Sequence, residues 1–145
     1  METDDNLPEE IATLLEAANT VAVVGIKSHP TEDAFRVAEY IQQAGYRVIP
    51  VNPKLDFVLN ETCHPSLAAI DEPIDIVNLF RASEHIPAHV DEILALEPSP
   101  GAVWMQLGIH HGPSAQRLRE AGIEVIQDRC IMVDHRRAQS SGDSP

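Results

Sequence analysis

The residues of this chain best suited to chemistry are its two lysines, each of which follows a short apolar run. Lys27 comes two residues after Gly25, and Lys54 directly follows Asn52 and Pro53. An ammonium group suits a phosphate, and a glycine allows backbone amides to approach phosphate oxygens closely. The pattern therefore predicts a site for a phosphate-bearing ligand.

Five runs rich in β-branched and apolar residues predict the strands that position these lysines. They cover residues 21–25, 47–51, 74–80, 101–106 and 123–128. Segments of helical periodicity separate most of them, which is typical of βαβ units. We predict an α/β, three-layer, doubly wound Rossmann-like fold with a five-stranded, mainly parallel sheet in the order 2-1-3-4-5. The polar clusters that follow the strands then gather at the carboxyl edge, where such sheets bind ligands.

The remaining elements follow from apolar stripes at helical spacing. These stripes predict helices over residues 7–18, 34–44, 86–97 and 113–121. The irregular stretch 55–72 predicts a short edge strand near Phe57 and a helical turn over residues 66–70. We expect an N-terminal helix within residues 1–18, a ligand-binding domain over 19–135 and a polar, flexible tail over 136–145.

The charge balance of this acidic protein limits its partners. The formal net charge is −13, with 23 acidic residues against 10 basic ones, which opposes attraction to nucleic acid or to an anionic membrane. We expect neither as a partner. Cys63 and Cys130 are far apart and lack the spacing of a zinc site, so we expect reduced thiols and a cytoplasmic location, with no metal.

Two common nucleotide-binding motifs are missing from the sequence. The turn after the first run has one glycine where the NAD fingerprint needs three, and Asn52-Pro53-Lys54 stands where NAD sites usually carry a carboxylate. There is also no GxxxxGK[ST] motif, so a P-loop nucleoside triphosphatase is not expected.

Several longer motifs together are more specific than a generic Rossmann pattern. They are Val21-Ala22-Val23-Val24-Gly25, Gly45-Tyr46-Arg47-Val48-Ile49-Pro50-Val51-Asn52-Pro53, Pro65-Ser66-Leu67, Pro73-Ile74-Asp75-Ile76-Val77, Phe80-Arg81, Val103-Trp104-Met105-Gln106-Leu107-Gly108 and Asp128-Arg129-Cys130. Over residues 18–135 the chain resembles the small stand-alone CoA-binding domain proteins. That family is similar to the N-terminal domain of the succinyl-CoA synthetase α subunit.

The resemblance implies a coenzyme A site at the carboxyl edge of the sheet, beside the first strand. The residues that would form it are Gly25, Ile26, Lys27 and Ser28 for the pyrophosphate, Asn52, Pro53 and Lys54 for the adenosine side, Phe80 and Arg81 for the opposite wall, and Gln106 and Gly108 at the exit of the fourth strand. The amides that open the following helix would assist through the helix dipole. Trp104 is expected in the core.

Two features depart from a simple phosphate site. Glu32 and Asp33 stand where the family often has an arginine and a small hydroxyl residue, and carboxylates near a pyrophosphate would oppose it unless they face solvent. Cys130 could be a reactive thiol, although a half-buried structural cysteine is the commoner case.

The histidines have a metal interpretation and a simpler one. His85 and His89 are four residues apart and His110 and His111 are adjacent, which invites a metal site. No further ligands occur at a recognisable spacing, so we expect exposed histidines. His110 and His111 follow the fourth predicted strand and could border the ligand.

We therefore expect a protein that binds CoA or an acyl-CoA without catalysis of its own. A homodimer is compatible with the sequence. A small NAD(P)-linked oxidoreductase or its regulatory fragment is the first alternative. An interaction module that has lost its ligand is the second.

Overall fold

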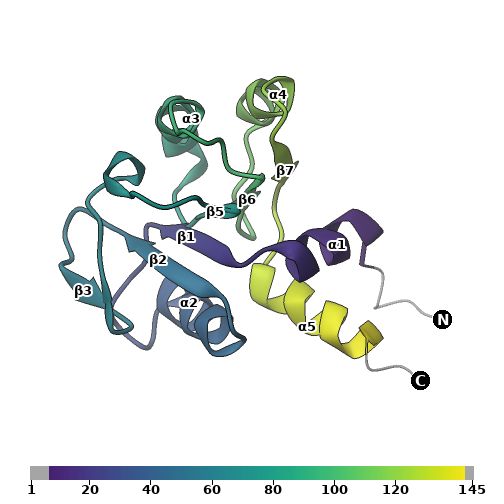
Figure 1. Cartoon of the computed structure of the whole chain (residues 1–145), viewed down its shortest axis with the longest axis horizontal. Coiled ribbons are helices and arrows are strands. Elements are labelled where there is room, and N and C mark those ends of the chain that lie inside the picture. Colours follow the sequence, from purple (N-terminus) through teal and green to yellow (C-terminus); the bar gives the residue numbers. More distant parts are fainter. Residues whose placement is uncertain (1–6, 143–145) are drawn as a thin grey trace.

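A five-stranded parallel sheet forms the centre of the computed structural model, which describes residues 7–142 (Figure 1). Its strands run in the order β2-β1-β5-β6-β7, and every neighbouring pair is parallel. They are β1 (Thr20–Val24), β2 (Arg47–Val51), β5 (Ile76–Leu79), β6 (Ala102–Met105) and β7 (Glu124–Ile126). This confirms the predicted fold class and strand order. The chain crosses from β2 on one side of β1 to β5 on the other, so the topological switch point lies beside β1.

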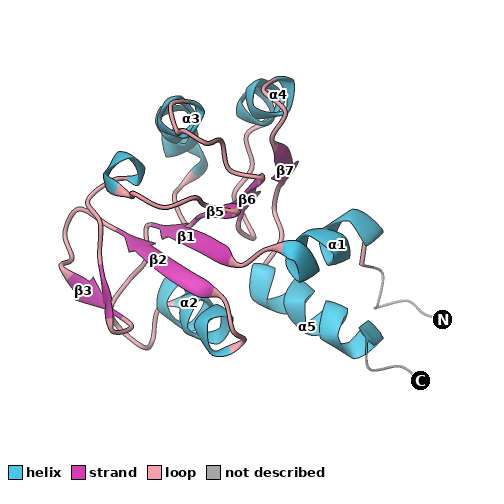
Figure 2. Ribbon diagram, viewed as in Figure 1, coloured by secondary structure: helices cyan, strands magenta, loops and turns pink. Residues whose placement is uncertain are grey.

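Helices cover both faces of the sheet, giving three layers (Figure 2). One face carries α3 (Ile86–Leu94) and α4 (Gly112–Glu120). The other carries α1 (Glu9–Ala17), α2 (Asp33–Gln43) and α5 (Ile131–Gly142). We call these the α3 face and the α2 face.

The alternation of side chains along β1 divides the core between these faces. Ala22 and Val24 pack on the α3 face, whereas Val21 and Val23 pack on the α2 face. Successive residues of a strand point to opposite sides, so a strand buried on both sides consists of apolar residues throughout. Trp104 is fully buried on the α2 face, as predicted, and its indole Nε1 donates to the Arg129 carbonyl at 2.8 Å.

The segment after β2 differs from the predicted single edge strand. It forms a small antiparallel pair, β3 (Phe57–Val58) with β4 (Glu61–Thr62), followed by a short 3₁₀ helix, η1 (Leu67–Ala69). The pair forms because Leu59 and Asn60 both adopt positive φ angles and reverse the chain in two residues. His64 then makes one parallel bridge to Val51, which places the segment beside β2.

The predicted flexible tail is a helix at residues 136–142, since α5 continues through them. Arg136, the first residue of the expected tail, has its guanidinium carbon 5.2 Å from the centroid of the Tyr40 ring. The first turn of α5, just before the expected tail, is also tied to the fold. Asp134 is 1% exposed and accepts hydrogen bonds from Arg129 at 2.7 and 3.0 Å, and His135 packs against tyrosines of the α2 face. Residues 143–145 of that tail and residues 1–6 of the N-terminal segment lie outside the described residues.

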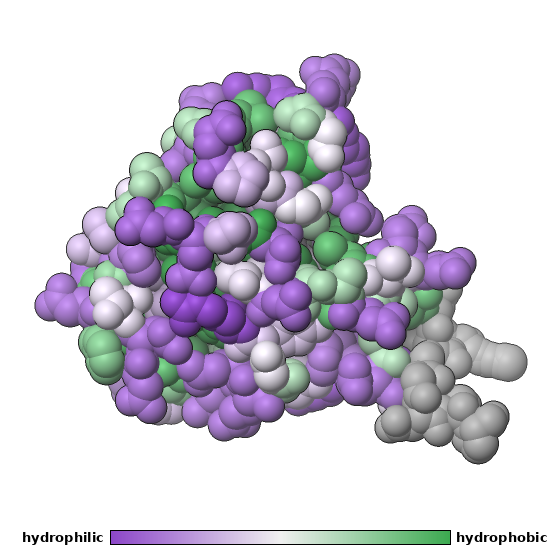
Figure 3. Space-filling view, in the orientation of Figure 1, coloured by the Kyte–Doolittle hydropathy of each residue, from purple (hydrophilic) through white to green (hydrophobic). Residues whose placement is uncertain are grey.

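Hydrophilic side chains dominate the face of the molecule seen in Figure 3. Within the described part of the chain, no helix combines the length and the apolar character that crossing a membrane would need.

Candidate functional site

The turn after β1 depends on Gly25. Its φ angle is +84°, and its N–H donates to the Val51 carbonyl at 2.9 Å. A Cβ atom at this position would lie 2.4 Å from the Phe80 carbonyl oxygen, far inside contact distance. Glycine is therefore required where the ends of β1, β2 and β5 converge.

Asn52 connects this turn to the one after β2. Its side-chain Nδ2 donates to the Ile26 carbonyl at 2.7 Å, and its Oδ1 accepts from the Lys54 N–H at 2.8 Å. The two turns that carry Lys27 and Lys54 are thus tied through one amide side chain. Each amide group of Asn52 uses one position in this arrangement, which leaves a second N–H on Nδ2 and a second lone pair on Oδ1.

A cavity of about 300 Å³ opens beside these turns at the carboxyl edge of the sheet. It is lined by Val24, Gly25, Lys27, Val51, Asn52, Pro53, Lys54, Pro65, Ser66, Arg81, His89 and Glu92. Val24 and Val51 belong to the core of the α3 face, so the cavity lies on that side of the sheet. Its position beside β1 is the switch-point crevice where open α/β sheets bind ligands.

Charged groups from separate parts of the chain meet at this cavity. Lys27, Lys54 and Arg81 follow three different strands, β1, β2 and β5, and supply only hydrogen-bond donors. Glu92 is the carboxylate among the lining residues, and its Oε2 already accepts from the Leu67 N–H at 2.9 Å. The cavity therefore combines three cations with one carboxylate that is already bound by the protein.

Six of the residues predicted for the site line this cavity, and five do not. The six are Gly25, Lys27, Asn52, Pro53, Lys54 and Arg81. Ile26 is instead buried in the core of the α2 face, and Ser28 is exposed beyond the lining. The Phe80 side chain also packs on the α2 face. Successive residues of an extended chain point to opposite sides, and Leu79 before it points to the α3 face, where the cavity lies.

Gln106 and Gly108 serve a different part of the carboxyl edge. The buried Gln106 Oε1 accepts from Asn78 Nδ2 at 3.2 Å and from the Ile131 N–H at 3.0 Å, which joins β5 and β6 to the start of α5. The Gly108 N–H donates to Asp128 Oδ1 at 2.7 Å. The structure thus gives both residues contacts that hold the edge loops.

The acidic pair before α2 stands away from the cavity lining. Glu32 and Asp33 are exposed, and Asp33 forms an ion pair with Arg36. Helix α2 begins only at Asp33, eight residues after Gly25, so its N-terminal residues are also absent from the lining. The start of α2 therefore does not reach the cavity, so the expected contribution of its dipole is absent there. The expected repulsion between the carboxylates of Glu32 and Asp33 and a pyrophosphate is absent for the same reason.

The two cysteines differ in environment. Cys63 is buried, and its burial raises the pKa of the thiol. Cys130 is half-buried at the start of α5 beside Arg129, which pairs with Asp134. Arg129 thus ties the loop before α5 to that helix through Asp134, and its carbonyl accepts from the Trp104 indole N–H.

The histidines are used separately. Across residues 7–142, no group of three His, Cys, Asp or Glu side chains could hold a metal ion. His85 and His110 are exposed, and His111 caps α4 by accepting the Ser114 N–H. His89 is not the exposed residue we predicted, because its side chain is only 19% exposed and lines the cavity.

Sequence reasoning missed six lining residues as parts of the site. They are Val24 and Val51, the last residues of β1 and β2, together with Pro65, Ser66, His89 and Glu92. Pro65 and Ser66 lie in the irregular segment between β4 and η1. His89 and Glu92 lie three residues apart on α3, a spacing that places side chains on one helix face and was the available signal.

Comparisons with known proteins bear on the family and the fold of the chain. A family model described as a CoA binding domain matches residues 19–136. The uncharacterized Bacillus subtilis (strain 168) protein YneT is 41% identical over 126 residues, which cover 87% of this chain and 92% of that protein.

Two solved structures share the fold over nearly their whole length. A Thermus thermophilus protein has a TM-score of 0.85 and 40% identity, covering 94% of this chain and 99% of its own. A hypothetical protein from Pyrococcus horikoshii OT3 has a TM-score of 0.86 and 31% identity, covering 96% and 97%.

Proposed function

This chain belongs to the CoA-binding domain family, and from that premise we propose that it binds coenzyme A or an acyl-CoA in the cavity beside Gly25, without catalysing a reaction of its own. The observation that carries the proposal is the convergence of Lys27, Lys54 and Arg81 on one cavity in a protein of net charge −13. CoA carries a pyrophosphate and a ribose 3′-phosphate, and such groups need several cations to replace their hydration.

The donor set of the site fits these phosphates. Lys27 and Arg81 would serve the pyrophosphate. A ligand that extends past the lining toward the turn after β1 would also meet the N–H groups of Ile26 and Ser28, which are not among the lining residues. Within residues 7–142, these two N–H groups have no backbone partner. Asn52, Pro53 and Lys54 would form the adenosine side. A volume of about 300 Å³ is at the small end for ligand sites, so the cavity would take the nucleotide end of CoA and leave the pantetheine arm outside.

The polar groups around the cavity favour binding over catalysis. Both amide groups of Asn52 and both carboxylate oxygens of Glu92 already have protein partners. A separate observation bears on the location of the protein, since the free thiols of Cys63 and Cys130 suit a reducing compartment such as the cytoplasm. The NAD-linked alternative is disfavoured, because Lys54 lines the cavity where a ribose-binding carboxylate would be needed. A cation there would suit the 2′-phosphate of NADP, so NADP is the alternative ligand that the experiment must separate from CoA.

Thermal unfolding with CoA, NAD, NADP and ATP added separately tests the proposal. A ligand at 100 times its Kd stabilises the native state by about 2.7 kcal/mol, and we expect this effect from CoA alone. Lys27→Ala and Lys54→Ala should each weaken CoA binding by roughly 3- to 10-fold, because each removes a charged contact to phosphate.

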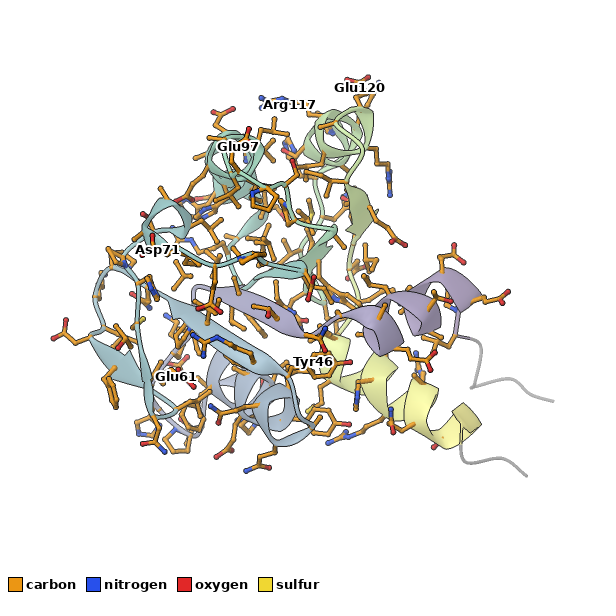
Figure 4. All side chains as sticks on the ribbon, viewed as in Figure 1. Tyr46, Glu61, Asp71, Glu97, Arg117 and Glu120 are labelled. Carbon is orange, nitrogen blue, oxygen red and sulfur yellow. The ribbon has the colours of Figure 1, made fainter. Side chains whose placement is uncertain are left out.

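Arg117→Ala is the matched control, since Arg117 lies on the outer side of α4 and pairs with Asp91 (Figure 4). Its removal should leave the CoA affinity unchanged. Absence of any CoA effect on the melt, or equal CoA affinity in wild type and both lysine variants, would contradict the proposal.

A further inference from the structure

His89 and Glu92 form a hydrogen-bonded pair on the wall of the cavity that α3 provides. His89 Nδ1 lies 3.2 Å from Glu92 Oε1, and both side chains are partly buried, with 19% and 24% exposed. Glu92 is itself fixed, because its other oxygen accepts the Leu67 N–H at 2.9 Å. The pair is therefore held from both ends, by its helix and by η1.

This contact determines which nitrogen of the neutral imidazole carries the proton. A carboxylate oxygen only accepts hydrogen bonds, so Nδ1 must be the N–H donor to Glu92. Nε2 of neutral His89 is then an acceptor with its lone pair available. Among the described residues, no hydrogen-bond partner is present at Nε2.

An acceptor on this wall complements the rest of the cavity. The side chains of Lys27, Lys54 and Arg81, which follow β1, β2 and β5, offer only hydrogen-bond donors. Such donors suit phosphates. The apolar lining residues Val24, Val51, Pro53 and Pro65 provide a surface against which a flat ring can be buried. A planar group with a donor at its edge would satisfy the remaining wall.

We propose, on the basis of the CoA site above, that His89 Nε2 accepts a hydrogen bond from the 6-amino group of the adenine ring. The Glu92 carboxylate acts as a positioning group that sets the tautomer. The site then selects 6-aminopurine nucleotides over 6-oxopurine nucleotides, because a 6-oxo group would bring an acceptor against an acceptor.

The affinities of CoA and of its inosine analogue, in which hypoxanthine replaces adenine, test this selection by titration calorimetry. The full-length wild type should prefer CoA by on the order of 10-fold, as expected for one mismatched polar contact in a partly buried site. His89→Leu should reduce this preference to about 1.

Glu92→Gln provides a test that a purely structural role of Glu92 would not pass. The glutamine Oε1 can still accept from the Leu67 N–H, and its amide N–H₂ then donates to His89 Nδ1. The imidazole must move its proton to Nε2, which becomes a donor suited to a 6-oxo group. The preference should therefore shift toward the inosine analogue.

Glu84→Gln is the matched control, because Glu84 lies 3.8 Å from His85 in an exposed pair that does not line the cavity. Its CoA preference should equal that of the wild type. Two results would overturn this inference and leave the CoA site unaffected. One is equal wild-type affinity for CoA and its inosine analogue, and the other is a ratio of these affinities that neither His89→Leu nor Glu92→Gln changes. Failure of the wild type to bind CoA would refute both proposals.

Discussion

Replacement of Asn52 should test whether one amide side chain holds the two lysine-bearing turns together. Asn52→Ala removes the Nδ2 bond to the Ile26 carbonyl, 2.7 Å long, and the Oδ1 bond from the Lys54 N–H, 2.8 Å long. The first bond is partly buried and the second is exposed. Loss of the first should therefore dominate, since water can replace only the second partner easily.

The expected cost follows from these two environments. A buried carbonyl left without a donor costs about 1–3 kcal/mol, and an exposed hydrogen bond contributes about 0.5 kcal/mol. We expect Asn52→Ala to lower the free energy of unfolding by about 1.5–3.5 kcal/mol. For a domain of this size, the Tm should fall by roughly 5–10 °C. CoA binding should weaken in parallel, because Lys27 and Lys54 would no longer be fixed relative to each other.

Asn52→Asp separates the contributions of the two bonds. Aspartate keeps the acceptor for the Lys54 N–H but faces the Ile26 carbonyl with another oxygen, so its cost should equal or exceed that of alanine. The measurement is urea unfolding followed by circular dichroism, with Asn19→Ala as the control because the Asn19 side chain is exposed. An Asn52→Asp variant as stable as the wild type would refute the assigned role of the Ile26 bond.

Two further predictions concern the turn and the α2 face. Gly25→Ala should lower the free energy of unfolding by at least about 3 kcal/mol, since the new Cβ combines an unfavourable φ with a clash with the Phe80 carbonyl. Gly108 has a similar φ of +87° but open space around it, so Gly108→Ala should cost only about 1–2 kcal/mol. Equal costs in urea unfolding would contradict the contact. Burial lowers the pKa of His135 below its usual 6.5. The unfolded state therefore binds a proton at this site more readily than the folded state does. The free energy of unfolding should be highest above pH 6.5 and should decline as the pH falls through the lowered pKa. His135→Phe should flatten that decline in melts recorded across pH and His85→Phe should not; an unchanged profile in His135→Phe would argue against the assignment.

The strands and their order could be predicted because a strand buried on both faces needs consecutive apolar residues, which can be recognised in the sequence. The run at residues 21–25 is apolar throughout, and the run at 47–51 is apolar after Arg47. Such runs are typical of strands in a parallel sheet that is covered on both faces. The segment expected as a flexible tail is helical as far as residue 142, because α5 packs on residues that are distant in the sequence. His135 contacts Tyr40, whose hydroxyl lies 2.8 Å from its Nδ1, across a separation of 95 residues.

The candidate site divides along the same line. Lys27, Lys54 and Arg81 could be predicted, since residues that follow parallel strands must gather at one edge. His89 and Glu92 could not be placed there, because their position depends on how α3 packs over the sheet. Ile26 shows the converse error, since its backbone belongs to the predicted turn but its side chain points into the α2-face core.

The placement of the cavity on the α3 face explains how an acidic protein could accept a phosphorylated ligand. On the α2 face, the Ile26 side chain fills the space beyond β1, and Glu32 and Asp33 stand before the helix on that side of the sheet. On the α3 face, the lining next to β1 and β2 is Val24 and Val51, and the cations of three strand ends surround it. The one carboxylate there, Glu92, accepts hydrogen bonds from Leu67 and His89, which disperse its charge. Local charge at the crevice is therefore opposite in sign to the net charge of the chain, and it is the local charge that a bound phosphate meets.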